Sequence, residues 1–391
     1  MTPAARVQAA IEVLDLVIAA ARSGGAPADR ILADWFRARR FAGGSDRRAV
    51  RDLVYRAVRA CGEAPLSGRA AMLLVARDDA LLAGLFDGSR HAPPPIAPDE
   101  PVAEAGTAPR WLERALADSG IAGGELTALL DRAPLDVRRN TLKPGPWQVP
   151  VDHEPTVARH GLRFPAGTPI ESWDAWRDGH LEVQDTGSQL ACDAVGTQPG
   201  ETVIDLCAGA GGKTLALAAD GGPSARIVAC DIHRDRLAKL MPRAERAGAG
   251  AMIETVLLDP GREAAALAGW EARADAVLVD APCSGTGTWR RNPEARWRLT
   301  EAALARYASE QARLLDIAAS LARPGGRLVY VTCSLLDGEG SDQIDAFLAR
   351  NAGWRAEPPH LPAGRPRGAG IRLTPAHDAT DGFFIARLLR L

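Results

Sequence analysis

The second half of the sequence predicts an open α/β sheet, preceded by a small α/β element and an N-terminal bundle of helices. Beyond residue 201, short apolar runs alternate with segments of helical periodicity, a pattern typical of buried strands joined by crossover helices. Two of these runs, residues 276–279 and 328–331, lead directly into turns that contain Cys283 and Cys333. Because ligands bind at the carboxyl ends of the strands in such sheets, we expect both thiols and Asp280 to line one pocket.

Length and composition bound the number of domains and the class of protein. At 391 residues the chain exceeds one ordinary domain, and we expect three domains, at residues 1–125, 126–185 and 186–391. A net charge of -2 argues against a uniformly basic surface, and six cysteines without C-x-x-C spacing signal neither a zinc site nor a disulfide framework. No leader-like start and no apolar run of membrane-spanning length is present, so we expect a cytoplasmic monomer that uses no membrane and no metal.

The first 60 residues carry the periodicity of three helices. Apolar residues recur at helical spacing in residues 3–22, 29–40 and 46–60, and Ser45 is the expected N-cap of the third helix. A proline-rich stretch further on, residues 92–98, indicates a linker or a surface loop.

The same region is locally basic. Residues 1–70 hold twelve arginines against seven acidic residues, an excess of five positive charges. Many of these arginines fall into two clusters, Arg37/Arg39/Arg40 and Arg47/Arg48/Arg51. Such clusters either contact the phosphates of a nucleic acid or form solvated helix faces, and the sequence leaves both interpretations open.

The middle of the chain predicts one further helix and the small α/β element. Residues 109–132 have helical character, and residues 134–143 alternate apolar with basic or polar side chains, as expected of a strand in an element that extends to about residue 180. Basic residues on the open face of such a sheet suit a nucleic-acid backbone, with a plain solvated face as the alternative. Residues 181–188 then lead into a helix at residues 189–195.

A glycine-rich turn follows the first strand of the large sheet, residues 202–206. The turn is Cys207-Ala208-Gly209-Ala210-Gly211-Gly212-Lys213-Thr214, and its glycines allow close approach of a ligand to the backbone. A phosphate loop would need glycine at position 207 and a dinucleotide turn would need glycine at position 214, so neither motif matches. S-adenosylmethionine fits better, because its amino-acid moiety and ribose need a close turn rather than a pyrophosphate cradle.

Two acidic residues follow the next strands. Asp231 ends the strand that begins at Arg226, where a carboxylate accepts hydrogen bonds from both hydroxyls of a ribose, as it also does in NAD-binding proteins. Asp259 follows a strand at residues 253–258, where it either contacts an adenine amino group or caps a helix.

A segment rich in arginine and tryptophan follows Cys283. Residues 289–298 contain four arginines and two tryptophans, so we expect a loop that holds phosphates and stacks on unpaired bases. A long amphipathic helix at residues 300–322 and a closing apolar strand at residues 381–388 complete the predicted sheet.

Several motifs together resemble one family. The stretch from Asp280 to Gly287, the Thr-Cys-Ser stretch around Cys333, the glycine-rich turn, Val183-Gln184-Asp185 and the closing Asp-Gly-Phe-Phe are similar to those of the Nop/Sun family of RNA cytosine-5 methyltransferases. The family's turn commonly has Ala-Pro where this chain has Gly209-Ala210, and both suit a tight loop. The N-terminal helices resemble, more loosely, the NusB-like domain of the bacterial 16S ribosomal RNA enzymes of type B.

The resemblance implies a fold, a substrate and residue roles. It implies a Rossmann-like S-adenosylmethionine methyltransferase domain, a small α/β RNA-binding element, a NusB-like RNA-binding domain and 16S rRNA as partner. Cys333 would be the nucleophile toward carbon 6 of cytosine, Cys283 would help remove the carbon 5 proton, Asp280 would contact the base, and Lys213 would orient these groups. The expected cofactor-binding residues are Cys207, Ala208, Gly209, Ala210, Gly211, Gly212, Lys213, Asp231, Asp259 and Asp280.

Two alternatives stay open. The same chemistry on transfer RNA or on another ribosomal site needs only a different RNA surface. A non-catalytic RNA-binding assembly factor would lack a catalytic cysteine or an intact cofactor turn, and the sequence retains both.

Overall fold

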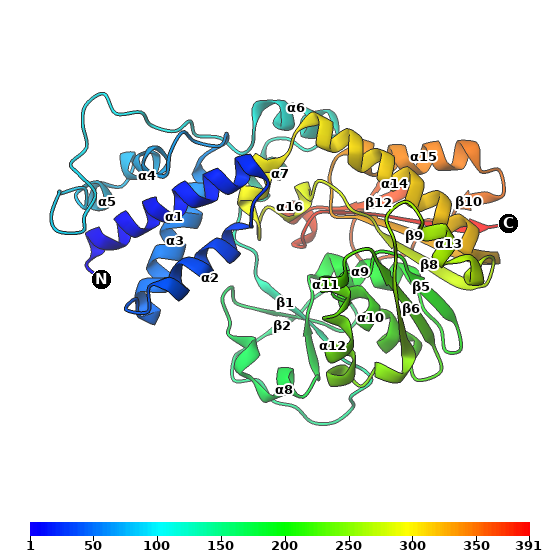
Figure 1. Cartoon of the computed structure of the whole chain (residues 1–391). Helices are drawn as coiled ribbons and strands as arrows, with labels where there is room; N and C mark the ends of the chain where they lie inside the picture. The colour runs from blue at the N-terminus through cyan, green and yellow to red at the C-terminus, as the bar shows by residue number, and fades with distance from the viewer. The chain divides into compact units, whose positions relative to one another are not determined.

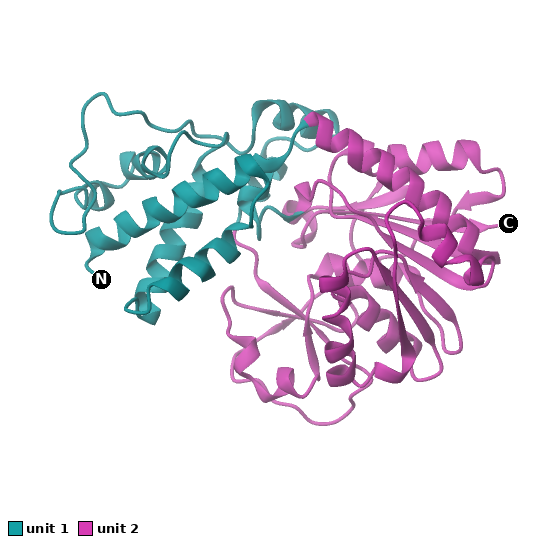
Figure 2. Cartoon of the chain, viewed as in Figure 1, with its two compact units in different colours: residues 1–131, 288–300 teal, residues 132–287, 301–391 magenta.

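The computed structural model describes residues 1–391, which divide into two compact units (Figure 2). Unit 1 comprises residues 1–131 and 288–300, and unit 2 comprises residues 132–287 and 301–391. The chain therefore passes between the units at three places, and a short piece from within the predicted C-terminal domain belongs to the helical unit. The division into three domains stays a prediction.

Unit 1 is helical. Its helices are α1 (Pro3–Ser23), α2 (Ala28–Ala38), α3 (Gly44–Ala60), α4 (Gly68–Arg77), α5 (Ala80–Ala83), α6 (Arg110–Asp118) and α7 (Gly124–Ala128). The three helices predicted first are confirmed to within a few residues, and the proline-rich stretch forms a loop of this unit.

Two predictions of helix ends in unit 1 are wrong. The N-cap of α3 is Gly43, not Ser45, because the Asp46 carboxylate accepts a hydrogen bond from the Gly43 backbone N–H one turn earlier. The single helix predicted at residues 109–132 breaks after α6, where Gly120 adopts a left-handed φ of 82° that a continuous helix excludes.

The segment at residues 288–300 completes unit 1 by capping three of its helices. The Glu294 carboxylate accepts from the first backbone N–H of α2, at Ala28, with an N···O distance of 2.9 Å. Arg296 donates to the carbonyls of Val58 and Cys61 at the end of α3, each at 2.7 Å. An acid at a helix start and a cation at a helix end both complement the helix dipole and satisfy backbone groups that lack intrahelical partners.

A third cap and a buried indole complete this arrangement. Arg298 donates to carbonyls that follow the last turn of α1, those of Gly25 and Ala26, each at 2.7 Å. Trp297 packs into the core of unit 1 and donates from Nε1 to the Gly62 carbonyl. The prediction that residues 289–298 form an exposed RNA-binding loop is wrong, since Trp289 and Arg296 are fully buried.

Unit 2 begins with the predicted small α/β element. Its four-stranded sheet has the order β2-β3-β1-β4, with all pairs antiparallel. The elements are β1 (Leu135–Arg139), β2 (Glu154–Pro155), β3 (Gly161–Phe164), α8 (Asp174–Arg177) and β4 (Leu181–Val183). The predicted basic open face is only partly present: Arg139 is exposed, but Arg138 is buried and its Nε donates to Gln184.

The rest of unit 2 is a nine-stranded mixed sheet with the order β11-β12-β13-β9-β8-β5-β6-β7, in which β10 also pairs with β13. The parallel strands are β5 (Thr202–Asp205), β6 (Arg226–Asp231), β7 (Ile253–Leu257), β8 (Ala274–Asp280) and β9 (Ala322–Thr332). The antiparallel strands are β10 (Trp354–Ala356), β11 (Arg365–Arg367), β12 (Gly370–Leu373) and β13 (Phe383–Arg390). The closing strand predicted at the C-terminus is confirmed as β13.

Strand order in this sheet reverses at β5. From β5 the chain continues to β6 and β7 on one side, and then returns to add β8 and β9 on the other side. This reversal is the topological switch point at which open α/β sheets form a crevice outside the carboxyl ends of the strands. The Rossmann-like arrangement predicted from the strand and helix rhythm is confirmed.

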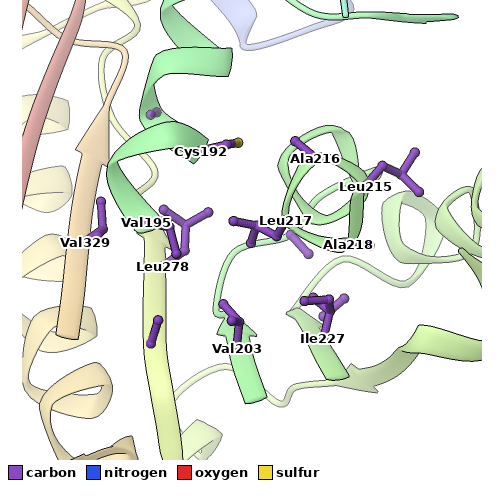
Figure 3. Close-up of a cluster of buried hydrophobic side chains, with 14 of the residues drawn as sticks. Cys192, Val195, Val203, Leu215, Ala216, Leu217, Ala218, Ile227, Leu278 and Val329 are labelled. Atoms are coloured by element: carbon purple, nitrogen blue, oxygen red, sulfur yellow. The ribbon is translucent and has the colours of Figure 1, made fainter. Parts of the chain in front are cut away.

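Helices cover both faces of the sheet (Figure 1). They are α9 (Thr186–Val195), α10 (Gly212–Gly221), α11 (Arg234–Leu237), α12 (Leu240–Ala247), α13 (Glu263–Ala266), α14 (Glu301–Leu321), α15 (Ser341–Arg350) and α16 (Pro375–Asp378). Alternate residues of β5 enter separate cores, Val203 with α9 and α10 and Ile204 with α14 and α15. Figure 3 shows the first core, where Val195 and Leu217 point toward Val203 and Leu278.

None of the helices is both long enough and apolar enough to cross a membrane.

Candidate active site

A cavity of about 390 Å³ lies in unit 2 at the carboxyl ends of the parallel strands. It therefore occupies the crevice that the strand order creates, and its volume falls in the range of roughly 300–1,000 Å³ typical of small-molecule sites. Its lining contains eight of the predicted site residues: Cys207, Ala208, Gly209, Ala210, Asp231, Asp280, Cys283 and Cys333. The structure thus brings together the glycine-rich turn, one acid of β6 and the two cysteine-bearing loops.

The two thiols face each other in this cavity. Cys283 lies in the loop after β8 and Cys333 directly follows β9, and these two strands are parallel neighbours. Their Sγ atoms are 3.4 Å apart, within hydrogen-bonding distance for sulfur. The hydrogen bond to Cys333, together with burial, raises the pKa of the Cys283 thiol well above its ordinary value. The raised pKa therefore favours the protonated form of Cys283 at neutral pH.

Two glycines fix the loop after Cys283. The Gly287 N–H donates to the Cys333 carbonyl at 2.9 Å, and the Gly382 N–H donates to the Gly287 carbonyl at 2.8 Å. A Cβ atom built on Gly287 would lie 2.2 Å from the Gly382 carbonyl oxygen, so only glycine allows this approach. This contact joins the Pro-Cys stretch to the closing Asp-Gly-Phe-Phe stretch.

Lys213 and Asp280 form an ion pair beside the thiols. Lys213 is in the first turn of α10 and donates to Asp280 Oδ2, at the end of β8, with an N···O distance of 2.7 Å. Burial disfavours the charged ammonium, but the Asp280 carboxylate outweighs burial and raises the pKa of Lys213. The same ammonium lies 5.7 Å from the ring centre of Phe383. Lys213 is thus a fixed cation that holds one oxygen of Asp280 in place.

The glycine-rich turn presents bare backbone to the cavity. Gly209 and Gly211 have left-handed φ values of 56° and 86°, and a Cβ on Gly211 would meet Leu240 at 2.6 Å. Asp231 accepts from the Gly209 N–H at 2.7 Å and from the His233 N–H at 2.6 Å. A carboxylate has about four lone-pair sites, so these two bonds orient Asp231 and leave acceptor capacity for a ribose.

Several predicted cofactor residues do not line the cavity. Gly211, Gly212 and Lys213 support the turn from behind, at the start of α10. Asp259 is exposed and follows β7, which ends two residues earlier, and its carbonyl accepts from the Arg262 N–H. Its proposed contact with adenine stays a prediction.

The structure adds polar residues that the sequence reasoning missed. His233, Arg236, Glu263 and Glu310 also line the cavity. The pattern offered one signal, since Asp231-x-His233 and Arg236 follow a strand at the same sheet edge. Glu339, six residues after Cys333, is buried directly behind the thiols. Its Asp-Gly-Glu-Gly context resembles a solvated turn, so the sequence did not indicate that Glu339 is buried.

Three of the four remaining cysteines lie outside the cavity. Cys61, Cys192 and Cys230 are buried, and burial is the main cause that raises the pKa of each thiol, to about 11 for Cys61. These residues pack as small apolar side chains. Cys207 is partly exposed in the cavity wall, and burial also raises its pKa.

Comparison with solved structures identifies the class of protein. The crystal structure of PH0851 matches with a TM-score of 0.79 and 25% identity and covers 99% of both chains. A methyltransferase homologue from Pyrococcus horikoshii matches with a TM-score of 0.56 and 26% identity over 72% of this chain and 100% of its own. NSun6 from the same organism, solved with SFG, has a TM-score of 0.60 at 19% identity, over 72% of this chain and 98% of its own, and shows the fold. These matches define the fold as the Rossmann-like architecture found in methyltransferases.

The family follows from the sequence comparison. The model of the 16S rRNA methyltransferase RsmB/F family matches residues 193–389, half of the chain, and the chain belongs to this family. Ribosomal RNA small subunit methyltransferase B of Xanthomonas campestris pv. campestris is 36% identical over 239 residues, which are 61% of this chain and 54% of that protein. The Citrobacter koseri protein of the same name is 35% identical over 59% of this chain and 51% of its own length. The chain thus spans about half the length of the curated relatives that it matches.

The resemblance seen in the motifs is therefore confirmed at the level of the family. Methyltransferases of this family use S-adenosylmethionine, the cofactor that the glycine-rich turn favours. The cavity fits this molecule, because it combines bare backbone at Gly209 with a carboxylate at Asp231 suited to a ribose. The roles of individual residues are not tested by these comparisons.

Proposed function

We propose that the chain is an S-adenosylmethionine-dependent methyltransferase that forms 5-methylcytosine in 16S rRNA through a covalent bond between Cys333 and the base. The observation that carries the proposal is the pair of thiols, 3.4 Å apart, on the wall of the same cavity as the glycine-rich turn and Asp231. Membership of the RsmB/F family and the names of the curated relatives support the choice of RNA.

The chemistry explains why two thiols are needed. Carbon 5 of cytosine is a poor nucleophile, and addition of the Cys333 thiolate to carbon 6 moves the ring electrons onto carbon 5. S-adenosylmethionine supplies the electrophilic methyl group. A base must then remove the carbon 5 proton, after which the electrons restore the ring double bond and the S–C6 bond breaks. Cys283 is the base next to this position, and no metal is required because the electrophile is already cationic.

The raised pKa of Cys283 orders these steps. Before reaction, Cys283 keeps its proton because it is hydrogen-bonded to Cys333 and buried. Once Cys333 is a thioether bonded to the base, it carries no charge and accepts a hydrogen bond only weakly. The leading cause of the raised pKa is then gone, so Cys283 gives up its proton more readily, to water in the cavity, and becomes a base at the stage where one is needed.

Asp280 and Lys213 supply the charges around the target base. Asp280 would hydrogen-bond the edge of the base near nitrogen 3, and the Lys213 ammonium behind it would offset the negative charge that develops in the ring. Lys213 holds Asp280 in the orientation that this contact requires, through the 2.7 Å ion pair. The target cytosine must leave its stack to enter the cavity, at a cost of a few kcal/mol if it begins stacked.

Unit 1 would bind the RNA as a NusB-like domain. Arg40, Arg48 and Arg51 are exposed and form no ion pair, so they are available for phosphates. Arg37 of the same predicted clusters pairs with Asp34, and Arg39 pairs with Glu12. The proposal further includes action as a monomer in the cytoplasm, and methylation of transfer RNA or another ribosomal site remains the second candidate.

The test compares two single substitutions in the full-length protein. Cys283→Ala and Cys333→Ala are incubated with S-adenosylmethionine and unmodified 16S RNA, and denaturing gels detect any protein–RNA adduct while tritium counting reports methyl transfer. We expect Cys283→Ala to accumulate the adduct and Cys333→Ala to form none and to transfer no methyl group. Cys61→Ala, a buried cysteine of unit 1, is the matched control and should behave as the wild type.

Each alternative has its own outcome. An adduct formed by Cys333→Ala would show that the two thiols have exchanged roles. Methyl transfer by the wild type to transfer RNA, but not to 16S RNA, would identify transfer RNA as the substrate and leave the proposed reaction unchanged. Binding of 16S RNA without transfer to either RNA would reject the enzyme and favour the assembly factor.

A further inference from the structure

Glu339 is a buried carboxylate that lies directly behind the two thiols. It is 2% exposed, at the end of the 3-10 helix η6 (Asp337–Glu339), and it forms no ion pair. A carboxylate buried without a cation costs several kcal/mol unless hydrogen bonds replace its water. Its position therefore needs an explanation in terms of the groups that it contacts.

Those contacts are with the residues that follow each thiol. Glu339 Oε1 accepts from the Ser284 backbone N–H at 2.9 Å, and Oε2 accepts from the Ser334 hydroxyl at 2.7 Å. The Ser284 hydroxyl also donates to Oε2, and the two serine Oγ atoms are 3.1 Å apart. A single carboxylate thus joins the residue after Cys283 to the residue after Cys333.

The same residue also reaches the positions that precede each thiol. Gln311 of α14 donates to Glu339 Oε1 at 3.2 Å and to the Pro282 carbonyl at 2.9 Å. The Glu339 carbonyl accepts from the Tyr330 hydroxyl at 2.9 Å and from the Thr332 hydroxyl at 3.3 Å. The loops that carry Cys283 and Cys333 are therefore each held on both sides of the cysteine.

Glu339 acts on the thiols through its charge as well as through its hydrogen bonds. After the hydrogen bond to Cys333, burial and the charge of Cys333 itself, the nearby Glu339 carboxylate is a further cause that raises the pKa of Cys283. A negative charge at this place helps to keep the proton on Cys283 until Cys333 has reacted.

We infer that Glu339 is a positioning residue that sets the distance between the two thiols and places a negative charge behind them. It does not line the cavity, and it acts through the Ser284 backbone N–H and the hydroxyls of Ser284 and Ser334. The inference rests on the proposed function for its consequence in catalysis, namely the order of adduct formation and release. The thiol geometry on which it depends is measurable without RNA.

The first experiment measures the distance between the thiols by their oxidation. Diamide converts two neighbouring thiols to a disulfide and is itself reduced to the hydrazine, and the 3.4 Å separation requires little movement to reach a bond of about 2 Å. Under excess diamide, with loss of free Cys283 and Cys333 followed by mass spectrometry, we expect Glu339→Ala to oxidise at least tenfold more slowly than the wild type. Ser334→Ala removes only the Ser334 side of the Glu339 network, so its oxidation rate should lie between those of the wild type and Glu339→Ala.

The second experiment separates the charge from the shape. Glu339→Gln keeps the size of the side chain and an acceptor for Ser284, but it lacks the negative charge. We expect the pH midpoint for alkylation of Cys283 by iodoacetamide to move to lower pH in this variant, because one cause of the raised pKa is removed. Circular dichroism and urea unfolding confirm that each variant is folded.

Glu201→Gln is the matched control. Glu201 precedes the amino end of β5, whereas the thiols follow the carboxyl ends of the strands, and it pairs with Arg327. Its loss should therefore alter stability without altering the thiols. Wild-type oxidation rates in Glu339→Ala, together with an unchanged alkylation profile in Glu339→Gln, would overturn the inference. Altered thiol behaviour together with wild-type protein that transfers no methyl group would retain the positioning role and reject the proposed function.

Discussion

The two units use their buried charged residues in opposite ways. In unit 1, Glu294 and Arg296 are buried against backbone groups at helix ends. Neither residue lines the cavity of the active site. In unit 2, Lys213 and Glu339 are buried behind groups that do face a cavity, the Asp280 carboxylate and the two thiols. Both regions are dense in charged and polar side chains, so composition alone does not separate a structural segment from a catalytic one. What each side chain faces decides its role.

Arg296→Ala should produce the largest effect and gives the sharpest test of this comparison. The substitution leaves the carbonyls of Val58 and Cys61 without a donor and opens a void, so we expect a loss of about 3–5 kcal/mol in the free energy of unfolding. Urea denaturation followed by tryptophan fluorescence measures the loss. Arg48→Ala, an exposed arginine of the same unit, should change stability by no more than about 0.5 kcal/mol. A stability loss below about 1 kcal/mol combined with weaker RNA binding would instead show that residues 289–298 contact RNA.

The next largest effect is expected from Asp205, and it concerns how the free energy of unfolding depends on pH. This last residue of β5 is fully buried and accepts from the Thr214 hydroxyl, and burial raises its pKa to about 7. Between about pH 4 and pH 7 the folded protein holds a proton that the unfolded chain has lost, so stability falls as the pH rises through this window. Across this pH window, we expect the free energy of unfolding of the wild type to fall by up to about 4 kcal/mol relative to that of Asp205→Asn.

The comparison of urea unfolding curves for the two proteins at several pH values measures this difference. Other titrating groups are the same in both proteins and cancel. A free-energy difference that stays constant from pH 4 to pH 7 would mean that Asp205 is charged in the folded protein, despite its burial.

The smallest effect on the fold is expected from the exposed arginines of unit 1. Replacing Arg40, Arg48 and Arg51 together by glutamine should leave the free energy of unfolding within about 0.5 kcal/mol for each position. If all three contact phosphates, the slope of log affinity for RNA against log salt should fall by about 2, since single strands give about 0.7 for each contact. Filter binding at several salt concentrations measures the slope. An unchanged slope would identify these arginines as solvated helix faces.

The sequence predicted the elements of the fold well where the signal is local. Period and length located the first helices, the strands of the large sheet and the closing strand, because each pattern reflects which face of one element is buried. The cysteine pair was also predictable, since both thiols follow apolar runs that become neighbouring parallel strands. The exact helix start at Gly43 was missed, because the cap depends on the Asp46 side chain rather than on Ser45.

The features that were missed depend on distant partners. Arg296 bonds carbonyls that lie more than 230 positions earlier in the chain, and nothing in residues 289–298 reports that those carbonyls lack donors. Arg138 alternates correctly for an open strand face but is buried. Glu339 sits in a short acidic turn, and only the three-dimensional pairing of two serines reveals that it is enclosed.

The interrupted course of unit 1 has a consequence for how the protein is made. Residues 132–287 must be synthesised between the two pieces of this unit, which at about 5–20 residues per second takes roughly 8–30 seconds. Throughout that interval the ends of α1 and α3 and the start of α2 emerge from the ribosome without their caps. Because residues 288–300 directly follow the loop that carries Cys283, the segment that finishes the N-terminal helices is translated immediately after half of the thiol pair. Helices α1, α2 and α3 are therefore synthesised well before unit 1 can complete its fold.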